Sequence, residues 1–155
     1  MEGTNIMILP ITLTAAGCAA LINLWLGIRI GQMRTKEKIS IGDGGNDNLI
    51  RRMRAQSNFI EFTPIVLVLI GLVESASGTS HWLWAVAILY LVGRILHPLG
   101  MDADGFGKGR MIGTLTSMLT TLGLGIYAIV LAFTAHADVT APMADDPAVS
   151  EVPQG

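Results

Sequence analysis

Charged side chains are scarce in this sequence. Asp, Glu, Lys and Arg make up 14% of its 155 residues, whereas 51% are hydrophobic, and the mean hydropathy is +0.55. A soluble domain has about 25% charged residues. The shortage argues against a soluble globular domain and indicates an integral membrane protein.

Cysteine is also nearly absent, as are the common catalytic and metal-binding motifs. The single cysteine, Cys18, has no second thiol in the chain to pair with, and its apolar surroundings favour a packing role. No Cys/His spacing suggests a metal site, and no spacing suggests a Ser-His-Asp set. The segment "IGDGGNDN" at 41–48 lacks the Gly-Lys-Ser/Thr ending of a phosphate-binding loop, so it predicts a turn that begins a helix.

Uncharged runs define the candidate membrane spans. Ile6–Ile28 and Met111–Ala135 contain no Asp, Glu, Lys or Arg, and about 20 apolar residues cross the hydrocarbon core. The uncharged runs Phe62–Val73 and Trp82–Gly93 are shorter. The pattern predicts four spanning helices, two of which have to extend beyond their apolar cores.

These two extensions would carry polar residues into the membrane. The second span has to reach back through Glu61 and Asn58, and the third has to continue through Arg94 to His97. Ionisable groups are therefore expected within the membrane margins, where they are expensive and usually functional.

Two polar residues near the expected helix ends have simple interpretations. His97 precedes Pro98, and a proline disfavours helical geometry at the residue before it. His97 therefore either ends the third helix or contacts a ligand. Glu74 lies at the outer boundary of the second span, where we expect a solvated helix end.

The distribution of basic residues predicts the orientation of the chain. All ten Lys and Arg residues fall within Arg29–Arg54 or Arg94–Arg110. Basic loops face the cytoplasm in membrane proteins, so both termini are expected on the other side. Residues 1–135 would form a four-helix transmembrane domain, and the acidic, proline-containing residues 136–155 a disordered tail.

A polar stripe runs along the second span. Arg51, Arg54, Asn58 and Glu61 follow one another at steps of three, four and three residues, which places them on one helix face. One interpretation is that the arginines anchor the helix at the headgroups while Asn58 and Glu61 hold helices together. Glu61 fits this poorly, because an unpaired carboxylate inside a bilayer costs roughly 2.5 kcal/mol or more. It is expected to have a cationic partner.

This stripe also carries a family resemblance. The segment "RAQSNFIEF" at 54–62, followed by Pro64, resembles the second-helix signature of the MAPEG family, the membrane-associated proteins in eicosanoid and glutathione metabolism. "GQMR" at 31–34 resembles the basic end of the family's first helix, and "GRILHPLG" at 93–100 resembles its third-helix Arg-x-x-His motif. The resemblance extends from about Leu13 to Phe133 and is closest to the bacterial branch.

The resemblance implies an architecture and a site. The fold would be an all-α integral membrane protein, a left-handed bundle of four transmembrane helices assembled as a homotrimer, with glutathione as co-substrate between protomers near the cytoplasmic side. Arg110 matches the position thought to activate the glutathione thiol. The positions that match glutathione-binding residues are Arg34, Arg54, Asn58, Glu61, Arg94 and His97.

The chemistry of glutathione agrees with these residue types. Its two carboxylates call for guanidinium groups and its ammonium for a carboxylate, which Arg34, Arg54 and Arg94 with Glu61 would supply. A free thiol has a pKa near 8.5, and only the thiolate is a nucleophile. A nearby positive charge on Arg110 would lower that pKa.

Three functions are compatible with the sequence. The first is a glutathione transferase or peroxidase acting on lipophilic small molecules in the membrane. The second is a non-catalytic lipid-binding or scaffold protein of the same family, because Phe62 and Met101 stand where active transferases generally have tyrosines. The third is a small multidrug or ion transporter, which has little use for clustered arginines. No feature indicates a nucleic-acid partner.

Overall fold

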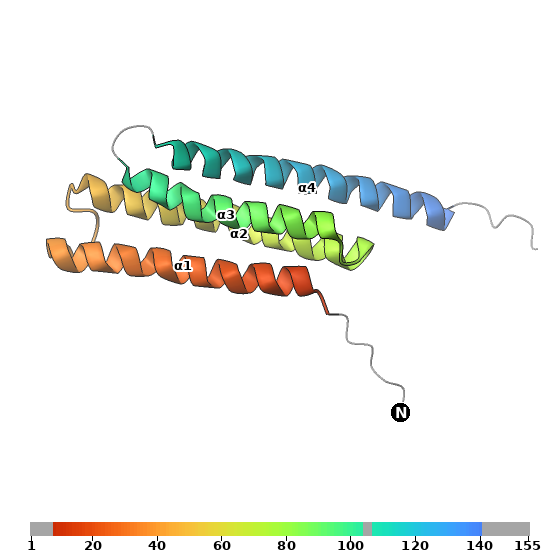
Figure 1. Cartoon of the computed structure of the whole chain (residues 1–155), viewed down its shortest axis with the longest axis horizontal. Helices are drawn as coiled ribbons and strands as arrows, with labels where there is room; N and C mark the ends of the chain where they lie inside the picture. The colour runs from red at the N-terminus through yellow and green to blue at the C-terminus, as the bar shows by residue number, and fades with distance from the viewer. Residues whose placement is uncertain (1–7, 104–106, 141–155) are drawn as a thin grey trace, which may run out of the picture.

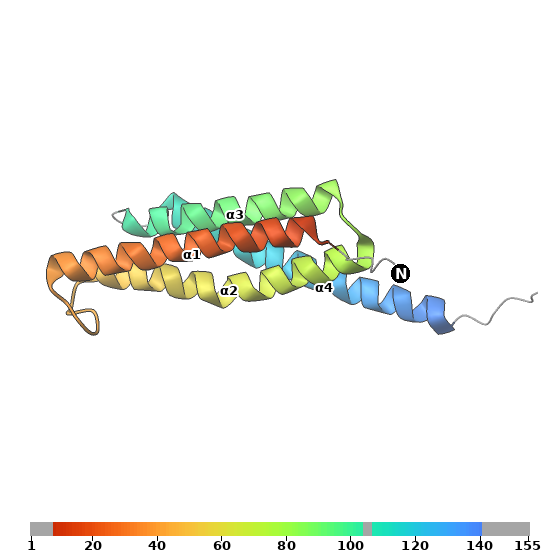
Figure 2. The same cartoon turned by 90° about the horizontal axis from the view of Figure 1, so that it is seen from below.

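Four long antiparallel helices make up the part of the chain that the structure describes. The computed structural model describes residues 8–103 and 107–140, with side chains to 135. The helices are α1 (Pro10–Glu37), α2 (Asp47–Ser77), α3 (His81–Asp102) and α4 (Lys108–Thr140). Helices α2 and α3 lie between α1 and α4, and the far end of α4 projects beyond the other three (Figures 1 and 2).

Each helix is long and apolar enough to cross a membrane, so the predicted all-α membrane fold is confirmed. Helix α2 reaches back through Glu61 and Asn58, as spanning length required, and α3 continues through Arg94. Helix α4 runs to Thr140, five residues into the range predicted as a tail. The remainder of that range, 141–155, lies outside the described residues.

The α1–α2 connection is a turn that caps the next helix, as "IGDGGNDN" predicted. Gly42, Gly44 and Gly45 have φ values of 71°, 59° and 72°, which residues with a side chain rarely adopt. The side chain of Asn46 then accepts a hydrogen bond from the Leu49 amide at 3.0 Å, which satisfies one of the unpaired N–H groups at the start of α2.

His97 does not end the third helix. Helix α3 continues through Pro98 to Asp102, so that alternative is wrong. His97 and Pro98 are both buried, and a proline is tolerated inside a membrane helix where neighbouring helices hold the local backbone. The packing of α4 provides that support.

Helices α3 and α4 pack backbone to backbone at the end near residue 103. A methyl group added at Gly113 would lie 2.5 Å from the Gly93 carbonyl oxygen and 2.6 Å from His97 Cβ, and one at Gly100 would collide with the backbone of Gly109 and Arg110. Small residues allow such close approach between membrane helices, where packing rather than hydrophobicity drives association. These contacts hold His97 against the first turns of α4.

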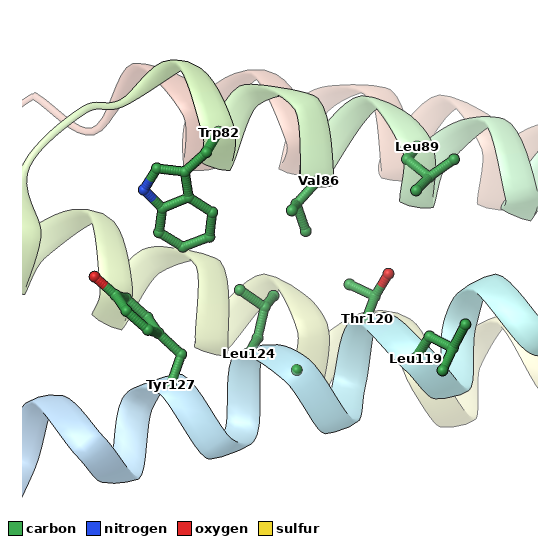
Figure 3. Close-up of a pocket in the computed structure, with 8 residues that line it drawn as sticks. Trp82, Val86, Leu89, Leu119, Thr120, Leu124 and Tyr127 are labelled. Carbon is green, nitrogen blue, oxygen red and sulfur yellow. The ribbon is translucent and has the colours of Figure 1, made fainter.

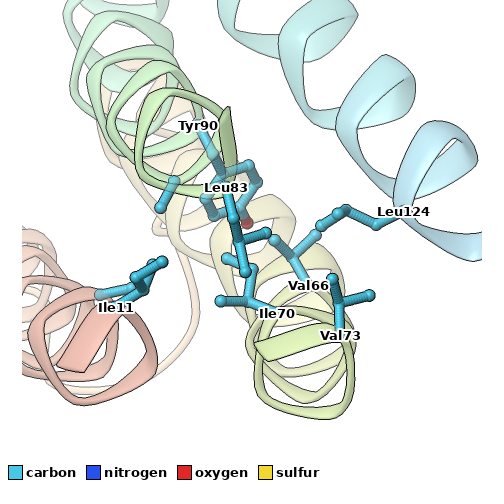
Figure 4. Close-up of a cluster of buried hydrophobic side chains, with 9 residues drawn as sticks. Ile11, Val66, Ile70, Val73, Leu83, Tyr90 and Leu124 are labelled. Carbon is cyan, nitrogen blue, oxygen red and sulfur yellow. The ribbon is translucent and has the colours of Figure 1, made fainter. Parts of the chain in front are cut away.

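The buried core draws side chains from all four helices toward α2 (Figure 4). The faces turned outward carry exposed leucines and isoleucines, as expected where a surface meets lipid rather than water. The labelled core residues are Ile11, Val66, Ile70, Val73, Leu83, Tyr90 and Leu124.

Glu74 is not a solvated helix end, as the sequence had suggested. It is only 2% exposed, and its carboxylate accepts hydrogen bonds from the Ile11 and Thr12 amides at 3.0 and 2.8 Å. The hydroxyls of Thr12 and Thr79 add bonds at 2.7 and 3.0 Å. Helix α1 has no side-chain cap of its own, so Glu74 of α2 satisfies its first N–H groups.

Candidate functional site

A polar groove lies between α2, α3 and α4 at the end of the bundle near residue 103. Its volume is about 260 Å³. Five of the seven predicted site residues line it, namely Arg54, Asn58, Glu61, His97 and Arg110, together with Ser57, Met101 and Thr114. The structure thus brings together residues from three helices that the sequence had assigned to one site.

The polar stripe of α2 forms one wall of this groove. Arg54 and Glu61 are exposed and Asn58 is half-buried, and all three side chains line the groove. No ion pair of Glu61 is found in the part of the chain that the structure describes. Among the described residues Glu61 therefore lacks the fixed cationic partner that the sequence had suggested, although Arg54 and Arg110 line the same groove.

Arg94 lies behind the groove rather than in it. Its side chain is 0% exposed, and it donates hydrogen bonds to Asn58 Oδ1 at 2.8 Å and Ser117 Oγ at 2.6 Å. Its guanidinium also lies 5.6 Å from the centre of the Phe59 ring, within range of a cation–π contact. Arg94 therefore fixes the orientation of Asn58 and joins α2, α3 and α4.

His97 links the third helix to the first turns of α4. Its Nδ1 lies 3.3 Å from the Arg110 carbonyl oxygen and 3.3 Å from Thr114 Oγ1. The imidazole is buried, yet its edge lines the groove. It thereby holds the helical turn that carries Arg110.

Arg34 does not line the polar groove. Its guanidinium donates to the Ser40 carbonyl at 3.4 Å and approaches Met53 Sδ at 3.7 Å. Met53 lines a separate pocket of about 280 Å³ with Asp43 and Ile50, which shares Arg54 and Ser57 with the polar groove. Arg34 thus contacts a residue of this second pocket without lining either space.

An ionic cluster that the sequence analysis missed lies at the same end of the bundle. Buried Arg29 of α1 forms an ion pair with Asp102 at the end of α3, and Arg52 Nε of α2 lies 3.6 Å from the same carboxylate. Arg52 also donates to the Arg29 carbonyl at 2.9 Å. The signal in the sequence is Arg29, which directly follows the uncharged run Ile6–Ile28. The sequence pattern alone indicates only that Arg29 belongs to a basic segment.

An apolar pocket adjoins the polar groove on the surface of α4. It has a volume of about 300 Å³ and is lined by Arg110, Met111, Thr114, Leu115 and Met118. Arg110 and Thr114 line both spaces. A polar ligand in the groove and an apolar molecule on α4 would therefore meet beside the Arg110 guanidinium.

Among the described residues, no group of three or more His, Cys, Asp or Glu side chains is close enough together to hold a metal ion. The side chains available in the groove are cationic, acidic, amide and hydroxyl groups. Such a set can bind a small zwitterion with several carboxylates.

Sequence comparison identifies relatives of the chain. The profile of the MAPEG family matches residues 12–130, a range that includes every residue lining the polar groove. The inner membrane protein YecN of Escherichia coli strain K12 is 29% identical over 83 residues, which cover 53% of this chain and 63% of that protein. The protein of the same name in strain CFT073 matches to the same extent. The chain thus spans less than two thirds of the length of these relatives.

Proposed function

The chain belongs to the MAPEG family, as its second-helix signature predicted, and from this premise we propose that it is a membrane-bound glutathione transferase or peroxidase. Membership supports a membrane role connected with glutathione or eicosanoid metabolism. The proposal adds that glutathione binds in the polar groove and reacts there with lipophilic electrophiles or hydroperoxides. Because the YecN relatives are named inner membrane proteins, it also places the protein in a bacterial inner membrane.

The observation that carries the proposal is the gathering of Arg54, Glu61 and Arg110 in one groove. Guanidinium groups bind carboxylates through two parallel hydrogen bonds, so Arg54 suits a carboxylate of glutathione. Glu61 suits its ammonium group. The amide of Asn58, oriented by buried Arg94, adds a further hydrogen-bonding group for the peptide portion.

Arg110 is the residue proposed to activate the thiol. A guanidinium beside the sulfur favours the thiolate and lowers the thiol pKa. In conjugation, the sulfur forms a bond to the electrophilic carbon while the leaving group departs with its bonding electrons. In peroxide reduction, two glutathione molecules and one hydroperoxide give the disulfide, an alcohol and water. The apolar pocket of Met111, Leu115 and Met118 would hold the second substrate.

The proposal includes a left-handed homotrimer with sites between protomers. Arg34 remains outside the groove of its own protomer, and a neighbouring copy would allow it to contribute a second guanidinium to the ligand. By the positive-inside rule we expect the groove at the cytoplasmic side, since all ten Lys and Arg residues lie in the two loops at this end or in the parts of the helices next to them.

A second candidate function is a non-catalytic lipid-binding or scaffold protein of the same family. The observation that favours it is Met101, whose thioether lines the groove where transferases of the family generally have a tyrosine. Phe62 likewise lacks a hydroxyl. A thioether is a poor hydrogen-bond partner, so two contacts to glutathione would be missing.

Turnover separates these two functions. The purified protein in lipid nanodiscs is supplied with glutathione and either chlorodinitrobenzene or a fatty-acid hydroperoxide. A transferase or peroxidase should exceed the uncatalysed rate, lose that excess in Arg110→Ala and keep it in the matched variant Lys108→Ala. Lys108 lies in the same first turn of α4 but does not line the groove. Glutathione binding without turnover on either substrate would favour the scaffold.

A further inference from the structure

A second, apolar groove lies between α3 and α4, extending toward the end of the bundle opposite Arg110. Its volume is about 470 Å³, within the range of natural small-molecule sites. Helix α3 contributes Trp82, Val86 and Leu89, and α4 contributes Leu119, Leu124 and Tyr127 (Figure 3). None of these residues belongs to the polar groove.

The groove exists because α3 and α4 diverge along their length. Near residue 103 the two backbones touch, and an added methyl group at Gly100 or Gly113 would strike the facing helix. At Gly123, which lines the apolar groove, an added methyl group would meet nothing within 4 Å. The space left by this divergence is part of the helix geometry and does not result from one small side chain.

The lining of the groove is apolar along its length except for Thr120 of α4, and it is polar at its outer end. The Trp82 and Tyr127 rings meet edge to face, with centroids 5.1 Å apart, and close that end. The indole nitrogen and the phenol oxygen both lie on the side away from Leu89 and Leu119 (Figure 3). Neither atom has a hydrogen bond to a residue within 8–103 or 107–135. Two hydrogen-bond donors thus lie at the outer end of a groove whose lining is otherwise mainly hydrocarbon.

We propose that this groove binds one acyl chain of a membrane phospholipid, whose ester oxygens accept hydrogen bonds from Trp82 and Tyr127. Tryptophan and tyrosine favour the depth at which the headgroups begin, and exposed Leu89 and Leu119 open the groove toward the lipid. The site is independent of the proposed glutathione chemistry.

A second copy of the chain fits this groove less well than a lipid. The outward faces of the helices consist mainly of leucine and isoleucine, and their backbone carbonyls are engaged within the helices. Such a face would cover the groove but would offer no acceptor to the Trp82 and Tyr127 donors, whereas burying a donor without an acceptor is costly. A phospholipid has an acyl chain that matches the apolar part of the groove, and ester oxygens next to it that match the donors at the outer end.

Two glycine variants test the proposal. Gly123→Leu fills the groove without a backbone clash. Gly125→Leu adds the same side chain on the same helix, also with open space at its Cβ, but outside the groove. In native mass spectrometry from mild detergent, wild-type protein and Gly125→Leu should retain phospholipid, and Gly123→Leu should lose most of it.

A tryptophan-quenching measurement provides a second readout. A variant that keeps Trp82 as the only tryptophan, with Trp25 and Trp84 replaced by phenylalanine, is placed in phosphatidylcholine vesicles brominated near mid-chain. Gly123→Leu should reduce the quenching of Trp82, and Gly125→Leu should leave it unchanged. Equal lipid retention and equal quenching in both variants would overturn the proposal. So would a change of oligomeric state in Gly123→Leu with lipid retention unchanged, since that result would make the groove an interface between copies.

Discussion

At the scale of single residues, the position of Arg94 in the structure differs from the one that its sequence motif suggests. The motif placed it among the glutathione-binding residues, but its guanidinium is buried against Asn58 and Ser117 and does not line the groove. The sequence specifies that an arginine follows Gly93. It does not specify how α3 is rotated, because that rotation depends on packing against three other helices.

Replacing Arg110 should impair the activation of the glutathione thiol more than it impairs glutathione binding. Arg110→Ala should raise the apparent pKa of the bound glutathione thiol toward its free value, because the neighbouring positive charge is removed. A shift of one unit corresponds to about 1.4 kcal/mol. The ultraviolet absorbance of the thiolate, titrated against pH, measures it. Lys108→Ala is the control, and an unchanged thiol pKa with unchanged turnover in Arg110→Ala would leave Arg110 as an interfacial anchor only.

At the scale of helices, much of the arrangement follows from the sequence. Uncharged runs predicted four helices, and the clustered Gly, Asp and Asn residues predicted the capped turn before Leu49, because these signals are local. The roles of Glu74 and Arg29 were not predictable in the same way. Each binds a group on another helix, the α1 N-terminus for Glu74 and Asp102 for Arg29, and no local pattern reports such a partner.

Because Glu74 caps α1, replacing it should lower the stability of the fold without lowering the affinity for glutathione. Glu74→Gln replaces charge-assisted hydrogen bonds by weaker neutral ones and should lower the free energy of unfolding by about 1–3 kcal/mol. Thermal unfolding in detergent, with and without glutathione, measures both effects. Glu37→Gln, on the exposed end of α1, is the matched control. Wild-type stability in Glu74→Gln would show that the cap contributes nothing.

Because α3 and α4 are in close contact at Gly113, a larger residue at this position should destabilise the protein. In Gly113→Ala the new methyl group would lie 2.5 Å from the Gly93 carbonyl oxygen, so the helices must separate, at a cost of about 1–3 kcal/mol. The His97 contacts that hold Arg110 should weaken as well. Unfolding temperature and turnover are compared with those of Gly125→Ala, whose added methyl group meets nothing within 4 Å. Equal behaviour of the two variants would contradict the packing described.

At the scale of the whole molecule, the predicted site residues do not all lie in one groove. Arg54, Glu61 and Arg110 line one groove, while Arg34 contacts Met53 of the adjoining pocket. The sequence predicted one site for these residues but not that Arg34 would lie outside the groove. A site between copies of the chain, as we propose, would depend on the surface between them, which periodicity within one chain does not encode.

Exposed charge on α2 predicts an oligomer. Arg54 and Glu61 lie on a spanning helix, and such side chains have to face protein or water rather than lipid tails. Crosslinking in native membranes and native mass spectrometry should therefore show trimers. A stable monomer in mild detergent that retains full turnover would contradict this assembly.

The most direct test of the central claim is calorimetric titration of the nanodisc-embedded protein with glutathione, comparing wild type with Glu61→Gln and the control Glu37→Gln. The account predicts saturable binding by the wild type and by Glu37→Gln. It predicts a loss of roughly 1.5–3 kcal/mol in binding free energy for Glu61→Gln with its oligomeric state unchanged, as expected when a charge-assisted hydrogen bond is removed. A wild-type dissociation constant weaker than about 10 mM, or equal affinities in all three proteins, would contradict the claim that this groove binds glutathione.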